Sequence, residues 1–192
     1  PRLTASSICV RRVGVGRGRA LGKNSQGGRE SFLGGDAVTR RGHEDVKAPR
    51  EAVYRALLDQ EAIPHWKVPY GMTCHVHHFE GREGGTFRIS LTYDAPTGAG
   101  KTTAHTDTYH GRFVELVPNE RVVEVDEFET DDSAMQGEMT VTFTLADADG
   151  GGTQLDAVHE GVPPGVSPAD NEYGWRMSLG KLAAYVEGVQ TG

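Results

Sequence analysis

The stretch SPADNEYGWRMSLGKLAAYVE, residues 167–187, decides the fold of this chain. Ser167 is a good N-cap residue and Pro168 suits a first helical turn, so a helix is predicted to begin here. Its apolar side chains recur every three or four residues and form one stripe along a helix of about twenty residues. The stripe consists of Trp175, Leu179, Leu182 and Val186. A helix with such a stripe must bury that face against another element.

Upstream of this helix, apolar and polar residues alternate. Phe87–Tyr93 (FRISLTY) and Met139–Leu145 (MTVTFTL) show this alternation, which predicts strands with one face on a core. Further strands are predicted at Met72–Glu80, Thr103–Val117, Arg121–Glu129 and Thr153–Val162. The connections between them are short and rich in turn residues, which is typical of an antiparallel meander.

Two short helices are predicted before the strands, at Arg50–Leu58 and Glu61–Trp66. In the first, Val53, Ala56 and Leu57 follow the helical spacing of a buried face. The order of two short helices, about six strands and one long helix predicts an α+β domain. In this domain the long helix covers the apolar face of a curved antiparallel sheet.

The charge of the 192-residue chain is unevenly distributed. The net charge is −7, but residues 1–45 hold nine basic and four acidic side chains, which leaves −12 for the remainder. Residues 1–45 are also rich in glycine and poor in large apolar residues, so we predict a disordered segment without a folded role, followed by a folded domain at 46–190. An acidic domain repels phosphate, so no nucleic-acid partner is expected.

The apolar runs and the cysteines predict a cellular setting. No apolar run approaches the ~20 residues that a membrane-spanning helix needs, so we expect a soluble protein without a membrane partner. Two cysteines, Cys9 and Cys74, cannot form a disulfide framework, which favours a reducing compartment and hence the cytoplasm.

Six sequence features follow one another in the order and spacing of a known family. They are APREAVYRALLD (48–59), Trp66, REGGTFR (82–88), YHGRFVELVPNERVV (109–123), HEGVP (159–163) and NEYGWRMSLGKLAAYVE (171–187). Together they resemble the AHSA family, bacterial relatives of a domain in the co-chaperone that activates the ninety-kilodalton heat-shock ATPase. The family belongs to the START-like (SRPBCC) superfamily. The resemblance covers Val46 to Glu187 and implies a helix-grip fold of six or seven strands.

One part of the chain departs from the family pattern. The family begins with an alternating strand, whereas Asp36–Val46 shows almost no alternation. Either a polar edge strand forms there or the sheet edge is left unpaired.

The resemblance implies a cavity between the concave face of the sheet and the long helix, which binds apolar or amphipathic small molecules. The same residues would also form an ordinary core, so both alternatives stay open. The candidate lining residues are Trp66, Phe87, Ile89, Leu91, Tyr93, Met139, Val141, Phe143, His159, Trp175 and Leu179. No cofactor is expected, and a homodimer is compatible with the sequence without being indicated by it.

Two other functions are considered. One is a cavity enzyme of the polyketide cyclase, dehydratase or hydrolase kind, with His159, His105 or His110 as the base. His159 shares a predicted strand face with apolar residues, where it would act on a ligand or be satisfied by a hydrogen bond. No catalytic constellation is present, so the catalytic residues are unknown and enzymatic activity is not predicted. The other function, co-chaperone, is not expected, because the eukaryotic activator has an additional domain.

Two local motifs are rejected as ligand sites. His75 and His77 share one strand face and supply two ligands at most, so no metal site is predicted. The string TGAGKT at 97–102 resembles part of a phosphate-binding loop, but it lies between two strands and lacks the first glycine. It is predicted to form a surface hairpin that carries Lys101 at its tip.

Overall fold

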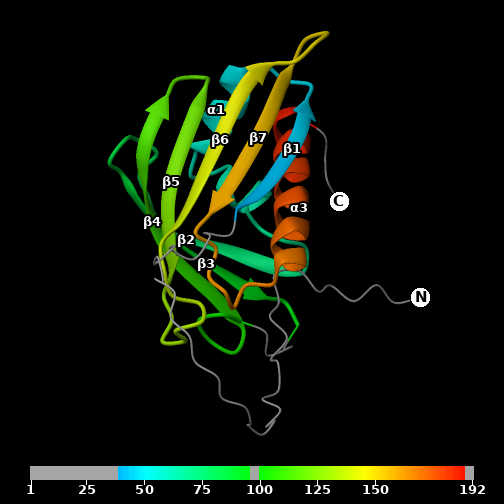
Figure 1. The fold of residues 1–192 in the computed structure, drawn as a ribbon. Helices are drawn as coiled ribbons and strands as arrows, with labels where there is room; N and C mark the ends of the chain where they lie inside the picture. The colour runs from blue at the N-terminus through cyan, green and yellow to red at the C-terminus, as the bar shows by residue number, and fades with distance from the viewer. Residues whose placement is uncertain (1–38, 96–99, 189–192) are drawn as a thin grey trace, which may run out of the picture.

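The computed structural model describes residues 39–95 and 100–188, which form an α+β domain (Figure 1). Its elements in chain order are β1 (Arg40–Val46), α1 (Arg50–Leu57), α2 (Ile63–Trp66), β2 (Met72–Phe79), β3 (Thr86–Tyr93), β4 (Thr106–Val117), β5 (Arg121–Phe128), β6 (Met139–Asp147), β7 (Thr153–Glu160) and α3 (Pro168–Val186).

Seven strands form one antiparallel sheet in the order β1-β7-β6-β5-β4-β3-β2. The sheet is curved, and α3 runs alongside its edge strand β1 (Figure 1). Helices α1 and α2 both contact α3. This arrangement confirms the predicted helix-grip fold.

The edge strand β1 forms, although its sequence barely alternates. It pairs with β7 from Arg40 opposite His159 to Val46 opposite Thr153. Gly42 faces α3, where an added Cβ would lie 2.8 Å from Cδ1 of Leu179. The alternation is weak because close contact with the helix requires a glycine at this inward position. Residues 1–38 lie outside the described part of the chain, so their predicted disorder stays a prediction.

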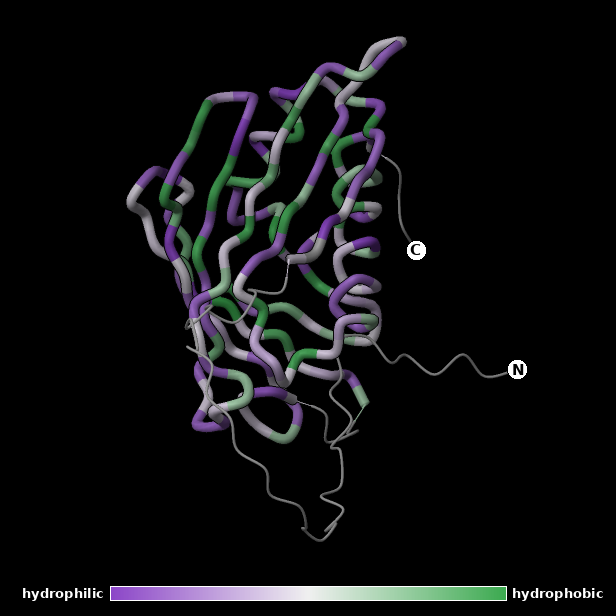
Figure 2. Tube along the Cα trace, viewed as in Figure 1, coloured by the Kyte–Doolittle hydropathy of each residue, from purple (hydrophilic) through white to green (hydrophobic). Residues whose placement is uncertain are grey.

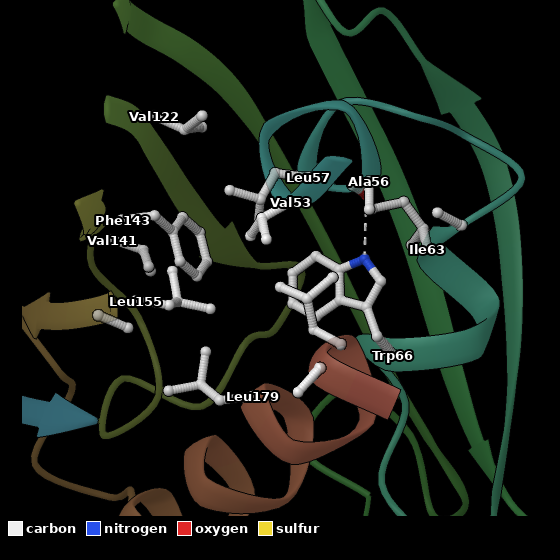
Figure 3. Close-up of a cluster of buried hydrophobic side chains, with 14 of the residues drawn as sticks. Val53, Ala56, Leu57, Ile63, Trp66, Val122, Val141, Phe143, Leu155 and Leu179 are labelled. Atoms are coloured by element: carbon white, nitrogen blue, oxygen red, sulfur yellow. Dashed lines mark hydrogen bonds between the residues drawn. The ribbon is translucent and has the colours of Figure 1, made fainter. Parts of the chain in front are cut away.

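The core lies between α3, the two short helices and the concave face of the sheet. Trp66 is buried at its centre, where its indole Nε1 donates a hydrogen bond to the Ala56 carbonyl at 3.2 Å (Figure 3). Its ring meets Phe143 edge-on, with centroids 6.1 Å apart. Leu155 and Leu179 are fully buried in the same cluster. Colouring by hydropathy shows the alternation along the strands that builds this core (Figure 2).

Most predicted element boundaries are confirmed to within one or two residues. Ser167 caps α3, and its side chain accepts a hydrogen bond from the Asp170 amide. Strand β4 begins three residues later than predicted, because the amides of Thr102 and Thr103 both turn back to the Thr106 carbonyl. Helix α2 begins at Ile63, two residues later than predicted.

The prediction for Lys101 is wrong. Its side chain is buried, and its Nζ forms an ion pair with Asp107. The backbone amide of Lys101 donates to the same carboxylate. This loop therefore folds inward at Lys101 and does not end in an exposed lysine.

Candidate functional site

A cavity of about 110 Å³ lies between α3 and one end of the sheet. Because the sheet is antiparallel, the ends of β3, β5 and β7 meet the beginnings of β4 and β6 there, close to the first turns of α3 (lower part of Figure 1). The residues lining the cavity are Lys67, Leu91, Lys101, Asp107, Tyr109, Asp126, Phe128, Met139, His159, Val166, Asn171, Gly174, Trp175 and Ser178.

Small side chains on α3 account for the hollow. Asn171, Gly174 and Ser178 recur at helical spacing and turn one face of the helix toward the cavity. A glycine and a serine leave space that a leucine would fill, and Trp175 covers only one side. The cavity therefore follows from the sequence of the first half of α3.

Four of the eleven predicted lining residues border the cavity: Leu91, Met139, His159 and Trp175. Six others are buried in the hydrophobic core: Trp66, Phe87, Ile89, Val141, Phe143 and Leu179. Tyr93 is half-buried and packs against this core. That any of these residues contacts a ligand stays a prediction.

His159 on β7 has a defined hydrogen-bonding state. Its Nδ1 receives the indole N–H of Trp175 at 2.9 Å and lies 3.2 Å from the amide nitrogen of Asn171. An indole nitrogen only donates, so Nδ1 is unprotonated and the neutral ring carries its proton on Nε2. Burial lowers the pKa of His159 to about 4, which keeps the ring neutral at pH 7. Nε2 is buried without a hydrogen-bond partner among the described residues.

Asp126 on β5 is the second polar group in the cavity wall. Its side chain is buried, and its Oδ1 has no partner among the described residues. Burial, reinforced by the nearby carboxylate of Glu124, raises the pKa of Asp126 to about 7. The positive charge of Lys67 and a backbone hydrogen bond offset part of this shift. Asp126 therefore keeps its proton to a higher pH than an exposed aspartate does.

Two buried ion pairs surround these groups. Lys67 Nζ lies 2.5 Å from Glu124 Oε1, and its ammonium also lies 5.1 Å from the centroid of the Phe87 ring. Lys101 and Asp107 form the second pair. Each buried charge in a pair is compensated by its partner, which is the condition for tolerating charges inside a protein.

The sequence analysis missed most of these polar residues. Lys67 and Lys101 lie in loops, where the sequence pattern gives no direction for a side chain. On β5, Glu124 and Asp126 share a face with Val122, whereas Val123 and Val125 occupy the other face. The alternation alone therefore favoured burial of the opposite face and gave no sign of the buried carboxylates.

The other histidines considered as bases lie outside the cavity. His105 and His110 are exposed, and His110 Nδ1 lies 3.5 Å from Glu129. His75 and His77 are exposed with their rings in contact, and His77 shares a hydrogen bond with Ser90. Among the residues described, no group of three or more His, Cys, Asp or Glu side chains is placed to hold a metal ion. None of the described helices has the length and hydropathy to cross a membrane.

The fold and the site define a helix-grip domain of the START-like (SRPBCC) kind. The chain belongs to the family described as Activator of Hsp90 ATPase homolog 1-like protein, whose model matches residues 47–187. A search of curated proteins finds no match.

Solved structures of bacterial proteins have the same fold. A Chromobacterium violaceum protein is 38% identical, with a TM-score of 0.68 over 78% of this chain and 96% of that one. A Rhodobacter sphaeroides protein is 20% identical, with a TM-score of 0.62 over 79% of this chain and 93% of that one. A Staphylococcus epidermidis protein is 16% identical, with a TM-score of 0.60 over 84% and 98% of the two chains. The last two show likeness of fold alone.

Proposed function

We propose that this protein binds a small apolar or amphipathic molecule in the cavity between α3 and the sheet. One observation carries the proposal. Three buried side-chain atoms lack a hydrogen-bond partner among the described residues, and all three belong to residues that line this cavity. They are Asp126 Oδ1, His159 Nε2 and Asn171 Oδ1.

Buried polar atoms without partners are rare in folded proteins, because each one costs about 1–3 kcal/mol. Three of them around one cavity have a common explanation if a bound molecule completes their hydrogen bonds. The rest of the lining is largely apolar and includes Leu91, Phe128 and Met139. An apolar wall with a few convergent polar groups is the usual form of a small-molecule site.

The volume limits the size of the ligand. At about 110 Å³ the cavity is smaller than the engineered apolar cavity of about 150 Å³ in another protein that binds benzene, but it is partly open to solvent, so part of a ligand can remain outside. We therefore expect a molecule whose buried part is one small ring or a short branched chain.

The enzymatic alternative with His159 as the base has less support. A general base needs an unprotonated atom aimed at the substrate. In His159 the unprotonated nitrogen, Nδ1, already receives the Trp175 N–H, and the free nitrogen is the one that carries the proton. His159 is thus arranged to donate a hydrogen bond to a bound molecule rather than to remove a proton from it.

The test compares two leucine substitutions on α3. Ser178→Leu fills the cavity, whereas Arg176→Leu adds the same side chain on the exposed face two residues away. Toluene is the probe, and its binding is followed by calorimetry and by thermal unfolding. We expect wild type and Arg176→Leu to bind it and Ser178→Leu to bind at least tenfold more weakly.

Native mass spectrometry of the protein purified from its own cells provides a second readout. A retained small molecule that is absent from Ser178→Leu supports the proposal. It is contradicted if wild type retains no molecule and binds no toluene, or if both leucine variants behave as wild type does.

A further inference from the structure

We propose that the ligand carries a small cationic amine, which the carboxylate of Asp126 binds. This inference rests on the proposed function and names the chemical class of the molecule. It predicts that the cavity prefers amines to alcohols, hydrocarbons and acids of the same size.

The charges around the cavity are unequal in number. Among the described residues there, two lysines face three acidic side chains. Lys67 is paired with Glu124, and Lys101 is paired with Asp107. With the residues that the structure describes, Asp126 forms no ion pair within 4 Å, and its Oδ1 accepts no hydrogen bond. The wall therefore has one buried carboxylate more than its ammonium groups compensate.

A buried carboxylate without a cation is costly, and it becomes favourable when an ammonium group donates to it. An amine on the ligand would complete the missing pair. An anionic ligand would instead add a further negative charge beside Asp126 and Glu124, so carboxylates and phosphates are expected to be rejected.

Sheet register places the second polar contact on the opposite side of the cavity. Asp126 on β5 pairs with Met139 on β6, and Val141, two residues further along β6, pairs with His159 on β7. Asp126 and His159 are therefore two strands apart and offset by two residues along the strands, with backbones roughly 12 Å from each other. Met139 on the intervening strand also lines the cavity.

This spacing describes the rest of the ligand. The Nε2–H of His159 has no acceptor among the described residues, and it suits an ether, carbonyl or hydroxyl oxygen. Asn171 presents its Oδ1, which accepts from a hydroxyl or a second N–H. A compact amine with an apolar middle and an oxygen at its far end would satisfy all three unpartnered atoms.

The titration of Asp126 agrees with this arrangement. Its pKa is raised to about 7 by burial, so a bound cation would return the group to its ionised form. The titratable groups facing it are Glu124 on its own strand, Tyr109 on β4 and Lys67 after α2. Lys101, Asp107 and His159 line the same cavity. Tyr109 and His159 stay neutral near pH 7, because burial raises the pKa of one and lowers that of the other.

The experiment titrates the full chain at pH 8 with four probes of similar size: benzylamine, benzyl alcohol, toluene and benzoate. We expect benzylamine to bind at least tenfold more tightly than benzyl alcohol, and benzoate to bind most weakly. Asp126→Asn should lose this preference, so that benzylamine and benzyl alcohol bind to it within about twofold of each other. Asp131→Asn removes an exposed carboxylate and serves as the control with the same change in net charge.

A pH series on the wild type tests the same idea without a substitution. Benzylamine affinity should fall about tenfold from pH 8 to pH 6, because Asp126 must then release a proton, whereas toluene affinity should stay constant. This measurement decides the matter if Asp126→Asn fails to fold.

The outcomes separate the two proposals. If toluene or benzyl alcohol binds in the cavity but benzylamine has no advantage, the amine inference is overturned and small-molecule binding stands. A benzylamine preference that survives in Asp126→Asn, or that does not change with pH, also overturns it. If none of the four probes binds, the amine inference is overturned, and the proposed function fails as well when native mass spectrometry finds no retained molecule.

Discussion

The two halves of α3 face the same sheet but build different environments. In the second half, Leu179, Leu182 and Ala183 are buried against a packed apolar core. In the first eleven residues, Asn171 and Ser178 are also buried but border a cavity. A single helix therefore supplies both the packing that holds the domain together and the open space beside it.

The strands repeat this division along their lengths. On β5 the inward positions change from Val122 in the core to Asp126 at the cavity, and on β7 they change from Leu155 to His159. The inward side chains of the strands are polar where the facing side chains of α3 are small. The comparison teaches that the packed core and the cavity lie at opposite ends of one sheet, so each end can be tested without destroying the other.

The largest effect is expected in the packed half. Trp66→Ala removes a fully buried indole and its hydrogen bond to Ala56, which should lower the free energy of unfolding by about 3–5 kcal/mol. Denaturant unfolding measures the change. Tyr70→Ala, at an exposed aromatic ring, is the control and should cost less than about 1 kcal/mol. Equal losses at the two positions would contradict the assignment of stability to this half.

The cavity half should change how the free energy of unfolding depends on pH. The native pKa of His159 is lowered to about 4, so the unfolded chain takes up its proton first as the pH falls. Stability is therefore complete above about pH 6.5 and declines as the pH falls toward 4, by about 3 kcal/mol in total. His159→Gln should remove this part of the decline when unfolding is measured from pH 8 to 4. His43→Gln is the control, because Asp156 raises the pKa of His43 by accepting its hydrogen bond.

Asp126 should change the pH dependence of stability in the opposite direction to His159. Its native pKa is raised to about 7, so the folded protein holds this proton more firmly than the unfolded chain does. The contribution of Asp126 to the free energy of unfolding is fully present below about pH 4 and is lost as the pH rises through 7. Relative to wild type, Asp126→Asn should thus gain stability between pH 5 and pH 8, on the order of 2 kcal/mol. A difference that is constant over this range would mean that Asp126 titrates normally.

The elements of the fold were predictable because they depend on periodicity. The stripe on α3 and the alternation on β3 and β6 each identify an apolar face. The helix and the sheet bury these faces by packing them against each other. The first strand was harder, because Gly42 stands where the alternation needs an apolar residue. For the site, sequence placed His159 on the inward face but could not locate the cavity. The position of the cavity depends on which inward side chains of α3 are small. Lys67, which also lines the cavity, lies in a loop.

The smallest effect provides the most direct comparison between the halves. Ser178 and Ala183 are both small and buried on α3, but only Ser178 borders the cavity. Ser178→Leu adds a side chain where space exists, so the free energy of unfolding should change by less than about 1 kcal/mol. Ala183→Leu adds the same volume to a packed core and should cost about 1–3 kcal/mol, through displaced side chains. Denaturant unfolding of the two variants under identical conditions checks this difference. Because both changes introduce leucine into the same helix, only the space opposite each residue distinguishes them, and equal costs would mean that the cavity half is as tightly packed as the other.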